Sequence, residues 1–118
     1  MAKKKPEFVE HLLDLLRPLG SEISARSMFG GWGFYHDGRM FALVAFETFF
    51  IKADDENRAT FTDRGLLPFR YEMRPGKWNE MSYYQPPTEA LESPAELCRW
   101  AQLGLEASLR APGLRKGA

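Results

Sequence analysis

The sequence predicts an α+β domain in two layers, with helices packed on an antiparallel sheet of about five strands. Residues 7–19 and 94–110 carry apolar side chains at helical spacing. Between them lie short aromatic and β-branched runs, separated by turn dipeptides such as Asp37-Gly38 and Pro75-Gly76. The expected order of elements is α-β-β-β-α-β-β-α.

Length and composition fit a single domain. The chain of 118 residues is 44% hydrophobic and 14% aromatic, so we expect residues 1–118 to form one domain with a core of about 7–110. Sixteen Lys and Arg balance sixteen Asp and Glu, and the net charge therefore requires no polyanionic partner. We interpret the basic ends as solvated termini, namely Lys3–Lys5 and Arg110 with Arg115 and Lys116.

The first helix is predicted over residues 7–19, with Phe8 and Leu12 among the apolar residues of one face. Pro18 and Gly20 mark its end, because proline clashes with the preceding turn and glycine adopts the left-handed closing conformation.

A three-stranded meander is predicted over residues 27–53. Its strands are the runs GFY, MFALVAF and FFIKA, separated by HDG and by ET. Asp37-Gly38 favours a tight reversal, since both residues tolerate positive φ. In FALVAF the side chains on both sides of the strand are apolar, so we expect this strand to be covered on both faces or central in the sheet.

A short helix and a second hairpin are predicted next. Asp54 can cap a helix over residues 55–64, whose few apolar residues suggest that it rests lightly on the sheet. From Phe69 onward apolar and charged residues alternate, which indicates a strand with one wet face. Pro75-Gly76 turns the chain into a partner strand that ends before Pro86-Pro87.

The last helix is predicted over residues 94–110. Ser93 is its N-cap, Pro94 occupies the first helical position, and Glu96 completes a capping box. Gly104 in its middle indicates a close approach to the sheet, despite a cost of about 1 kcal/mol in helix propensity.

The glycine cluster of Gly30, Gly31 and Gly33 is not a nucleotide loop. A dinucleotide fingerprint needs a third glycine where this chain has His36, and it needs a helix to follow, whereas strand residues follow here. We favour a bent strand entering a hairpin and keep a glycine-lined ligand or partner groove as the alternative. The predicted fold determinants are Gly30, Gly31, Gly33, Asp37, Gly38 and Gly76.

No constellation of residues indicates catalysis, a cofactor or a metal. His11, His36 and Cys98 fall on three different elements without the paired spacing of zinc sites. Cys98 is the single cysteine and is expected to be a small buried hydrophobe, with redox sensing as the alternative if it is exposed. No apolar run is long enough for a membrane span or a signal peptide. We therefore expect a cytoplasmic protein that is not an enzyme and has no membrane partner.

Basic and aromatic residues interleave around the second hairpin. This arrangement can be a solvated face, a protein-binding face or a platform on which single-stranded bases stack. Glu72 and Glu80 weaken the positive field and make nucleic acid the less favoured partner. The candidate partner-binding residues are Lys52, Arg70, Arg74, Lys77, Trp78 and Tyr84.

The chain resembles the N-terminal domain family of TfoX/Sxy, bacterial regulators of competence genes. The resemblance runs through residues 25–108 and rests on SMFGGWGFYHDGRMFALV, FIKAD, GLLPFRYEMRPGKWNEMSYYQPP and ESPAELCRWAQLGLEAS. The matching motif positions are Met28, Phe29, Gly30, Gly31, Gly33, Asp37, Gly38, Lys52, Pro68, Gly76, Lys77, Met81, Ser82 and Tyr83.

This resemblance implies an α+β domain similar in outline to secretion chaperones. It also implies a regulatory or protein-interaction role in DNA transformation and transcription regulation, without catalysis. Full-length competence regulators carry a second, helical C-terminal domain, whereas this chain ends soon after its last helix, so we expect it to act through protein partners or in an unrelated process. Homodimerisation stays open, because the aromatic content is high for this length.

Overall fold

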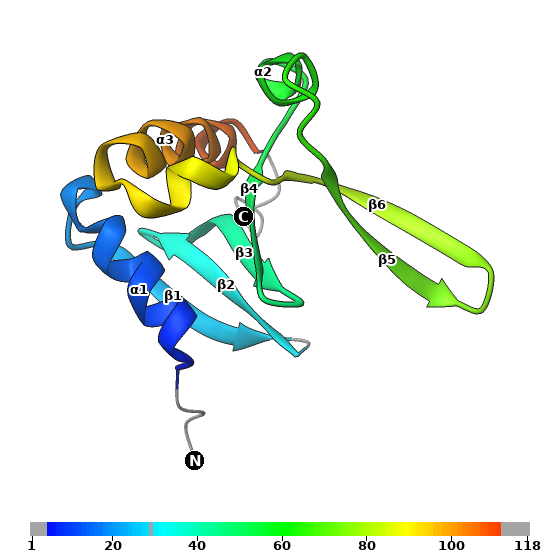
Figure 1. Cartoon of the computed structure of the whole chain (residues 1–118), viewed down its shortest axis with the longest axis horizontal. Coiled ribbons are helices and arrows are strands. Elements are labelled where there is room, and N and C mark those ends of the chain that lie inside the picture. Colours follow the sequence, from blue (N-terminus) through cyan, green and yellow to red (C-terminus); the bar gives the residue numbers. More distant parts are fainter. Residues whose placement is uncertain (1–4, 29, 112–118) are drawn as a thin grey trace.

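The computed structural model describes residues 5–28 and 30–111 (Figure 1). The elements are α1 (Glu7–Leu15), η1 (Arg17–Leu19), β1 (Ile23–Met28), β2 (Gly31–His36), β3 (Arg39–Ala45), β4 (Thr48–Lys52), α2 (Arg58–Thr62), β5 (Pro68–Arg74), β6 (Lys77–Tyr84), η2 (Thr88–Glu92) and α3 (Pro94–Arg110). The predicted α+β class and the antiparallel sheet with helices are confirmed, and the sheet has six strands.

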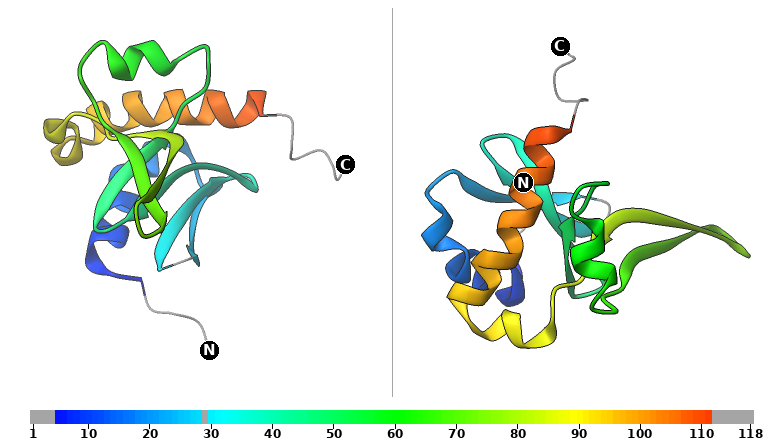
Figure 2. Two further views of the ribbon diagram at one scale, coloured as in Figure 1. Left: turned by 90° about the vertical axis from the view of Figure 1, so that its right-hand side faces the viewer. Right: turned by 90° about the horizontal axis from the view of Figure 1, so that it is seen from above.

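The strands lie in the order β1-β2-β3-β4-β6-β5, and all neighbouring pairs are antiparallel. β4 and β6 are in register only at Ile51 with Tyr84 and at Lys52 with Tyr83. The β5–β6 hairpin therefore leaves the main sheet and projects away from the helices (Figures 1 and 2).

The base of this hairpin is held by polar contacts as well as by the short ladder. Arg58 donates to Ser82 Oγ at 2.9 Å, and Ser82 donates to the Ala53 carbonyl at 2.8 Å. The Ala53 amide donates to the Ser82 carbonyl at 2.8 Å. A two-stranded ribbon is marginal by itself, so these contacts and the packing of its base give it a defined position.

The first helix ends earlier than the predicted residue 19. α1 stops at Leu15, and the next turn continues as the 3-10 helix η1, which contains Pro18. Pro18 has no amide hydrogen and clashes with an α-helical turn before it, so the tighter turn replaces the last α-helical one. Val9, Leu12 and Leu15 form the buried stripe of α1.

The meander has four strands where three were predicted. β1 was missed because half of its residues, ISARSM, are polar and it lies at the edge of the sheet. The predicted bent strand through the glycine cluster is accordingly wrong, since β1 and β2 are separate strands joined by a turn in which Gly30 has φ +79°. Phe29, another motif position, lies outside the described residues.

The predicted reversal at Asp37-Gly38 is confirmed, with φ of 51° and 84°. The β3–β4 turn was placed one residue too late, at Glu47-Thr48. It is formed by Phe46 and Glu47, with φ of 53° and 59°. This reversal contains neither glycine nor asparagine, so no local turn signal marks its position in the sequence.

The short helix predicted over residues 55–64 is confined to α2. Asp54 does accept hydrogen bonds from the amides of Glu56 and Asn57, at 3.0 and 3.2 Å, but these close the turn that precedes the helix. The expectation that the helix rests lightly on the sheet is wrong. Phe61 is fully buried, and its ring lies 5.4 Å from that of Tyr84 and 5.5 Å from that of Trp100.

α3 has the predicted bounds and cap, with Ser93 Oγ accepting from the Glu96 amide at 3.3 Å. A Cβ on Gly104 would lie 2.5 Å from the Phe41 carbonyl oxygen and 2.9 Å from Ile51 Cγ2. The close approach expected at this glycine is therefore confirmed, and it is what seats α3 on β3 and β4.

The two faces of the sheet are different. α1 and α3 pack on one face, which we call the helix-covered face, and bury the main core there (Figure 2). The largest fully buried side chains of this core are Phe34, Phe41, Phe49 and Phe61. The opposite face, which we call the open face, has a smaller apolar cluster built from strand residues: Leu43, Phe50 and Tyr83, with Met40, Ala45, Phe69 and Met81 against them.

Candidate functional site

The register of the strands determines which side chains share the open face. Arg26 on β1 is opposite Gly33 on β2, which is opposite Leu43 on β3 and then Phe50 on β4. Residues two positions apart on one strand share this side. The open face therefore carries Arg26, Met28, Gly33, Tyr35, Met40, Leu43, Ala45, Phe50 and Lys52, with Met81 and Tyr83 on β6 and Phe69 and Tyr71 on β5.

A groove of about 600 Å³ lies between the main sheet and the β5–β6 hairpin on the open face. We call it the open-face groove. Its lining is almost entirely apolar and comes from β1, β2, β3, the β5–β6 hairpin and the turns that hold Gly30 and Phe46: Met28, Gly30, Gly31, Trp32, Leu43, Val44, Ala45, Phe46, Phe69, Tyr71 and Met81. This volume is typical of binding pockets.

Phe46 stands at one end of this groove in an unusual conformation. Its side chain is 80% exposed, although its residue has a positive φ that glycine or asparagine adopts more readily. The Thr48 hydroxyl donates to the Phe46 carbonyl at 3.2 Å and holds the turn, while the Phe46 ring lies 6.4 Å from the Phe69 ring. A strained backbone that presents an exposed aromatic ring beside an apolar groove is a feature of binding sites.

The glycines shape the same region. A Cβ on Gly31 would lie 2.2 Å from the Val44 carbonyl oxygen, and one on Gly33 would lie 2.8 Å from Met28 Sδ. Gly30 and Gly31 line the open-face groove and also a second hollow of about 590 Å³ beside the start of α1. The close contacts at Gly31 and Gly33 fit the structural role that we favoured for these glycines, and Gly30 and Gly31 also line hollows, as the alternative of a glycine-lined groove requires.

Two cations lie over tyrosine rings at the other end of the open face. The Arg26 guanidinium is 4.7 Å from the centre of the Tyr35 ring, and Lys52 Nζ is 5.2 Å from that of Tyr83. Burial, with a smaller contribution from Tyr35, raises the pKa of Tyr83 to about 12, so its hydroxyl is neutral at physiological pH. We call these four residues the cationic patch.

The predicted partner-binding residues do not form one surface. Lys52 belongs to the open face, whereas Arg70 and Trp78 lie on the opposite side of the hairpin, which we call its outer face. There the Arg70 guanidinium is 5.3 Å from the Trp78 ring and 3.7 Å from Glu80.

The other three predicted partner-binding residues lie on β5 and β6. Arg74 and Lys77 face each other at the exposed tip of the hairpin. Tyr84 is only 8% exposed and stacks on Phe61, so its placement on the surface is corrected: it is a core residue. The alternation of the strand could not reveal this, because β6 passes from the projecting hairpin into the sheet along its length.

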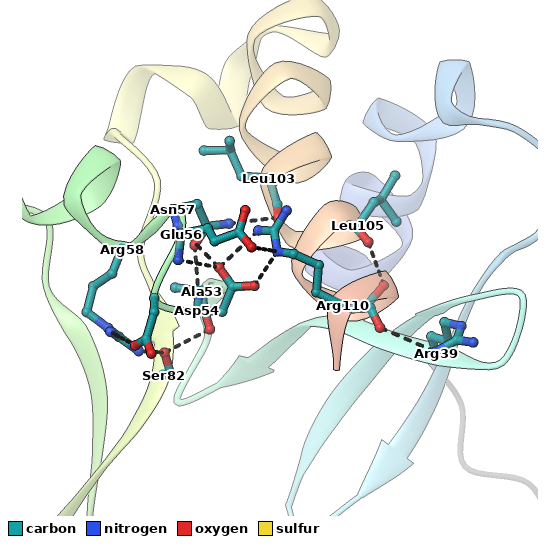
Figure 3. A network of polar contacts seen from close by, with 12 residues as sticks. Arg39, Ala53, Asp54, Glu56, Asn57, Arg58, Ser82, Leu103, Leu105 and Arg110 are labelled. Carbon is teal, nitrogen blue, oxygen red and sulfur yellow. Dashed lines mark hydrogen bonds and ion pairs between the residues drawn. The ribbon is translucent and has the colours of Figure 1, made fainter. Parts of the chain in front are cut away.

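A polar network joins the turn before α2 to the end of α3 (Figure 3). Arg110 donates to both oxygens of Asp54, at 2.6 and 2.9 Å. Asn57, 5% exposed, accepts from the Asp54 amide at 2.8 Å and donates to the Leu103 carbonyl at 2.9 Å. These hydrogen bonds, that of Arg110 above all, hold the pKa of Asp54 below its usual value.

The interpretation of Arg110 as part of a solvated terminus is therefore wrong. Its partner lies 56 positions away in the sequence, and no local pattern connects the two. Asp54 and Asn57 bond to each other and to Arg110 and the Leu103 carbonyl, so the network ties the turn before α2 to α3 and stabilises the fold.

The next candidates are the cysteine, as a reactive thiol, and the histidines, as metal ligands. Cys98 is half-buried, its thiol donates to the Leu15 carbonyl at 3.3 Å, and burial raises its pKa, the opposite of the shift in reactive cysteines. Within residues 5–28 and 30–111, His, Cys, Asp and Glu side chains form no group of three that could hold a metal ion. No helix in the same ranges is long and apolar enough to cross a membrane.

Comparison with known proteins supplies the family. Among curated proteins, none matches this chain. The family model of the TfoX N-terminal domain matches residues 14–108, which include all six strands, α2 and most of α3. This match covers the fold, the open-face groove and the cationic patch. The chain belongs to the TfoX N-terminal domain family.

Proposed function

We propose that this protein is a non-enzymatic regulatory module that binds a protein partner through the open face of its sheet. Its family is regulatory and has no known catalytic activity. The observation that carries the proposal is the apolar open-face groove with the exposed ring of Phe46 at its end. A role in DNA transformation or transcription regulation, in the cytoplasm, follows from this family relationship as part of the proposal.

The lining of the groove has the composition of a protein interface. Aromatic and methionine side chains are enriched in the centres of interfaces, and a few buried aromatic anchors carry most of the binding energy. Met28 and Met81 have unbranched side chains that can adapt to a partner, while Phe69 and Tyr71 stack at 5.7 Å and form a firm wall.

Affinity capture from the native cell, followed by mass spectrometry, tests this function with two matched variants. Phe46→Asn removes the exposed ring and keeps a residue that tolerates positive φ, so we expect captured partners to be lost while the fold is retained. Leu109→Gln removes another exposed apolar side chain, 65% exposed on α3, and should leave capture unchanged. Equal capture by the Phe46 variant and the unchanged protein would contradict the proposal.

The outer face of the hairpin supports a second candidate, binding of single-stranded nucleic acid. Arg70 and Trp78 are stacked there, Trp78 is 53% exposed, and Arg74 and Lys77 lie at the tip. Binding of a fluorescent oligonucleotide should then weaken steeply as salt rises, and Trp78→Ala should abolish it. An absence of salt-sensitive binding at low ionic strength removes this candidate.

A further inference from the structure

Charge is distributed unequally between the two faces of the sheet. The six strands contain only two carboxylates, Glu72 and Glu80. Glu72 pairs with Trp78 and Glu80 with Arg70, which places both carboxylates on the outer face of the hairpin. Away from the hairpin tip, where Arg74 and Lys77 face each other, the strand residues of the open face therefore include two cations, Arg26 and Lys52, and no acid.

These two cations have no carboxylate partner among the ion pairs of residues 5–28 and 30–111. Their charged groups lie instead over the rings of Tyr35 and Tyr83. A ring beneath a cation holds it in place without neutralising its charge, so each can still bind an incoming carboxylate.

The cationic patch and the open-face groove belong to one continuous surface. Leu43 lines the groove and also packs in the cluster that contains Phe50 and Tyr83. The Phe50 ring is 5.1 Å from that of Phe69, another lining residue. A ligand that fills the groove can thus extend over the cluster to Lys52.

The pairing of the strands limits which secondary structure a peptide segment can have when it binds to this surface. β4 has no β6 partner at Thr48–Phe50, and a segment that joined this edge would be an extended strand. The amides and carbonyls of β2 and β3, in contrast, are engaged on both sides by neighbouring strands, so a segment lying over these two strands finds no strand edge to join. Such a segment has to satisfy its own backbone hydrogen bonds, which an α-helix does.

We propose that the open face binds an acidic amphipathic helix of a partner protein. Apolar side chains of this helix fill the groove beside Phe46, and its carboxylates pair with Arg26 and Lys52. The inference rests on the proposed function, since it names the class of partner for the same face. The ends of this chain are poor occupants because they are basic, with Lys3–Lys5 at one end and Arg115 and Lys116 at the other.

Selection from a random peptide library displayed on phage tests the inference without a known partner. The full chain is the target, and Phe46→Asn is used to remove peptides that do not depend on the groove. We expect the enriched peptides to be net acidic, with apolar residues three and four positions apart. Enriched peptides that are neutral or basic overturn the inference, as does the absence of any peptide that depends on Phe46.

A synthesised enriched peptide then measures the contribution of the two cations. The double variant Arg26→Gln with Lys52→Gln should weaken its binding by about tenfold or more, and rising salt should weaken binding to the unchanged protein. The matched control, Arg70→Gln with Arg74→Gln, removes the same charge from the outer face and the tip of the hairpin. Equal effects of the two double variants overturn the inference.

Sedimentation equilibrium distinguishes a partner helix from a second copy of this chain. A dimer that dissociates in Phe46→Asn would show that the face binds itself, and this result overturns the inference. Failure of the inference is separable from failure of the proposed function. If capture of native partners depends on Phe46 while the selected peptides are not acidic, only the inference fails; if capture is independent of Phe46, both fail.

Discussion

The helix-covered face and the open face both carry paired phenylalanines, but the pairs are packed differently. Phe34 and Phe49 meet edge to face at 5.4 Å and are buried beneath the helices. Phe50 and Phe69 are 5.1 Å apart on the open face, where Phe69 is only half-buried and Phe46 beside it is 80% exposed. One face thus closes its rings into the core, whereas the other leaves apolar surface exposed.

The largest expected effect contrasts one phenylalanine from each face. Phe34→Ala should lower the free energy of unfolding by about 3–5 kcal/mol, because it opens a cavity in the closed core. Phe69→Ala removes a half-buried ring and should cost about 1 kcal/mol. Urea denaturation of both variants measures the difference, and equal costs would mean that the open face is also a closed core.

A smaller effect is expected at the two adjacent glycines of the groove. Gly31→Asn should lower the free energy of unfolding by about 1–3 kcal/mol, since its Cβ would collide with the Val44 carbonyl on β3. Gly30→Asn should be nearly neutral, because the added Cβ meets open space and asparagine tolerates the left-handed conformation. Thermal unfolding of the pair checks this, and similar losses at both positions would contradict it.

Relief of backbone strain at Phe46 should have the opposite sign. Phe46→Asn is expected to raise the free energy of unfolding by up to about 1 kcal/mol, since its positive φ is less costly for asparagine and the exposed ring buries little. Phe46→Ala keeps a Cβ in the same conformation and should show no gain. A loss of stability in the asparagine variant would show that the ring supports the fold, which would remove the contrast between the faces.

The smallest effect is expected at acid pH, in the network between α2 and α3. Because the pKa of Asp54 is lowered in the folded state, its ionised form adds stability above the unfolded value of 3.8, and this contribution is lost as the pH falls through the folded pKa. Asp54→Asn should therefore be less stable than the unchanged protein at neutral pH, and the two should converge below about pH 4. Urea midpoints across this range measure it.

This variant also checks that the two faces act separately. Asp54 pairs with Arg110 at the end of α3 and does not line the open-face groove, so Asp54→Asn should bind an enriched peptide with unchanged affinity. A changed affinity would show that the network influences the groove.

The local elements followed from short-range chemistry. Ser93 and Pro94 marked the start of α3, Asp37-Gly38 marked a hairpin, and Gly104 marked the contact between α3 and the sheet. The missed strand β1 has a half-polar edge-strand sequence, and the Phe46-Glu47 turn uses residues that seldom form turns. Both features are stabilised by neighbours in the sheet, which a local pattern does not contain.

The residues of the candidate site, too, were predicted only in part. Lys52 was predicted to bind a partner and lies on the open face, but Phe46, Arg26 and Met28 were not singled out for binding. Their isolated positions in the sequence carry no binding motif. They become one surface because neighbouring antiparallel strands place them side by side.

By itself the sequence determined the α+β class, the N-cap of α3, the second hairpin and the family, because these depend on periodicity, turn residues and motif order along the chain. Only the tertiary structure decided which face of β3 is covered by helices. FALVAF is apolar on both sides, and the choice depends on where α1 and α3 return and on how far the β5–β6 hairpin diverges from β4. That divergence leaves the open-face groove accessible, and register alone gathers Arg26 and Lys52 on the same side of the sheet.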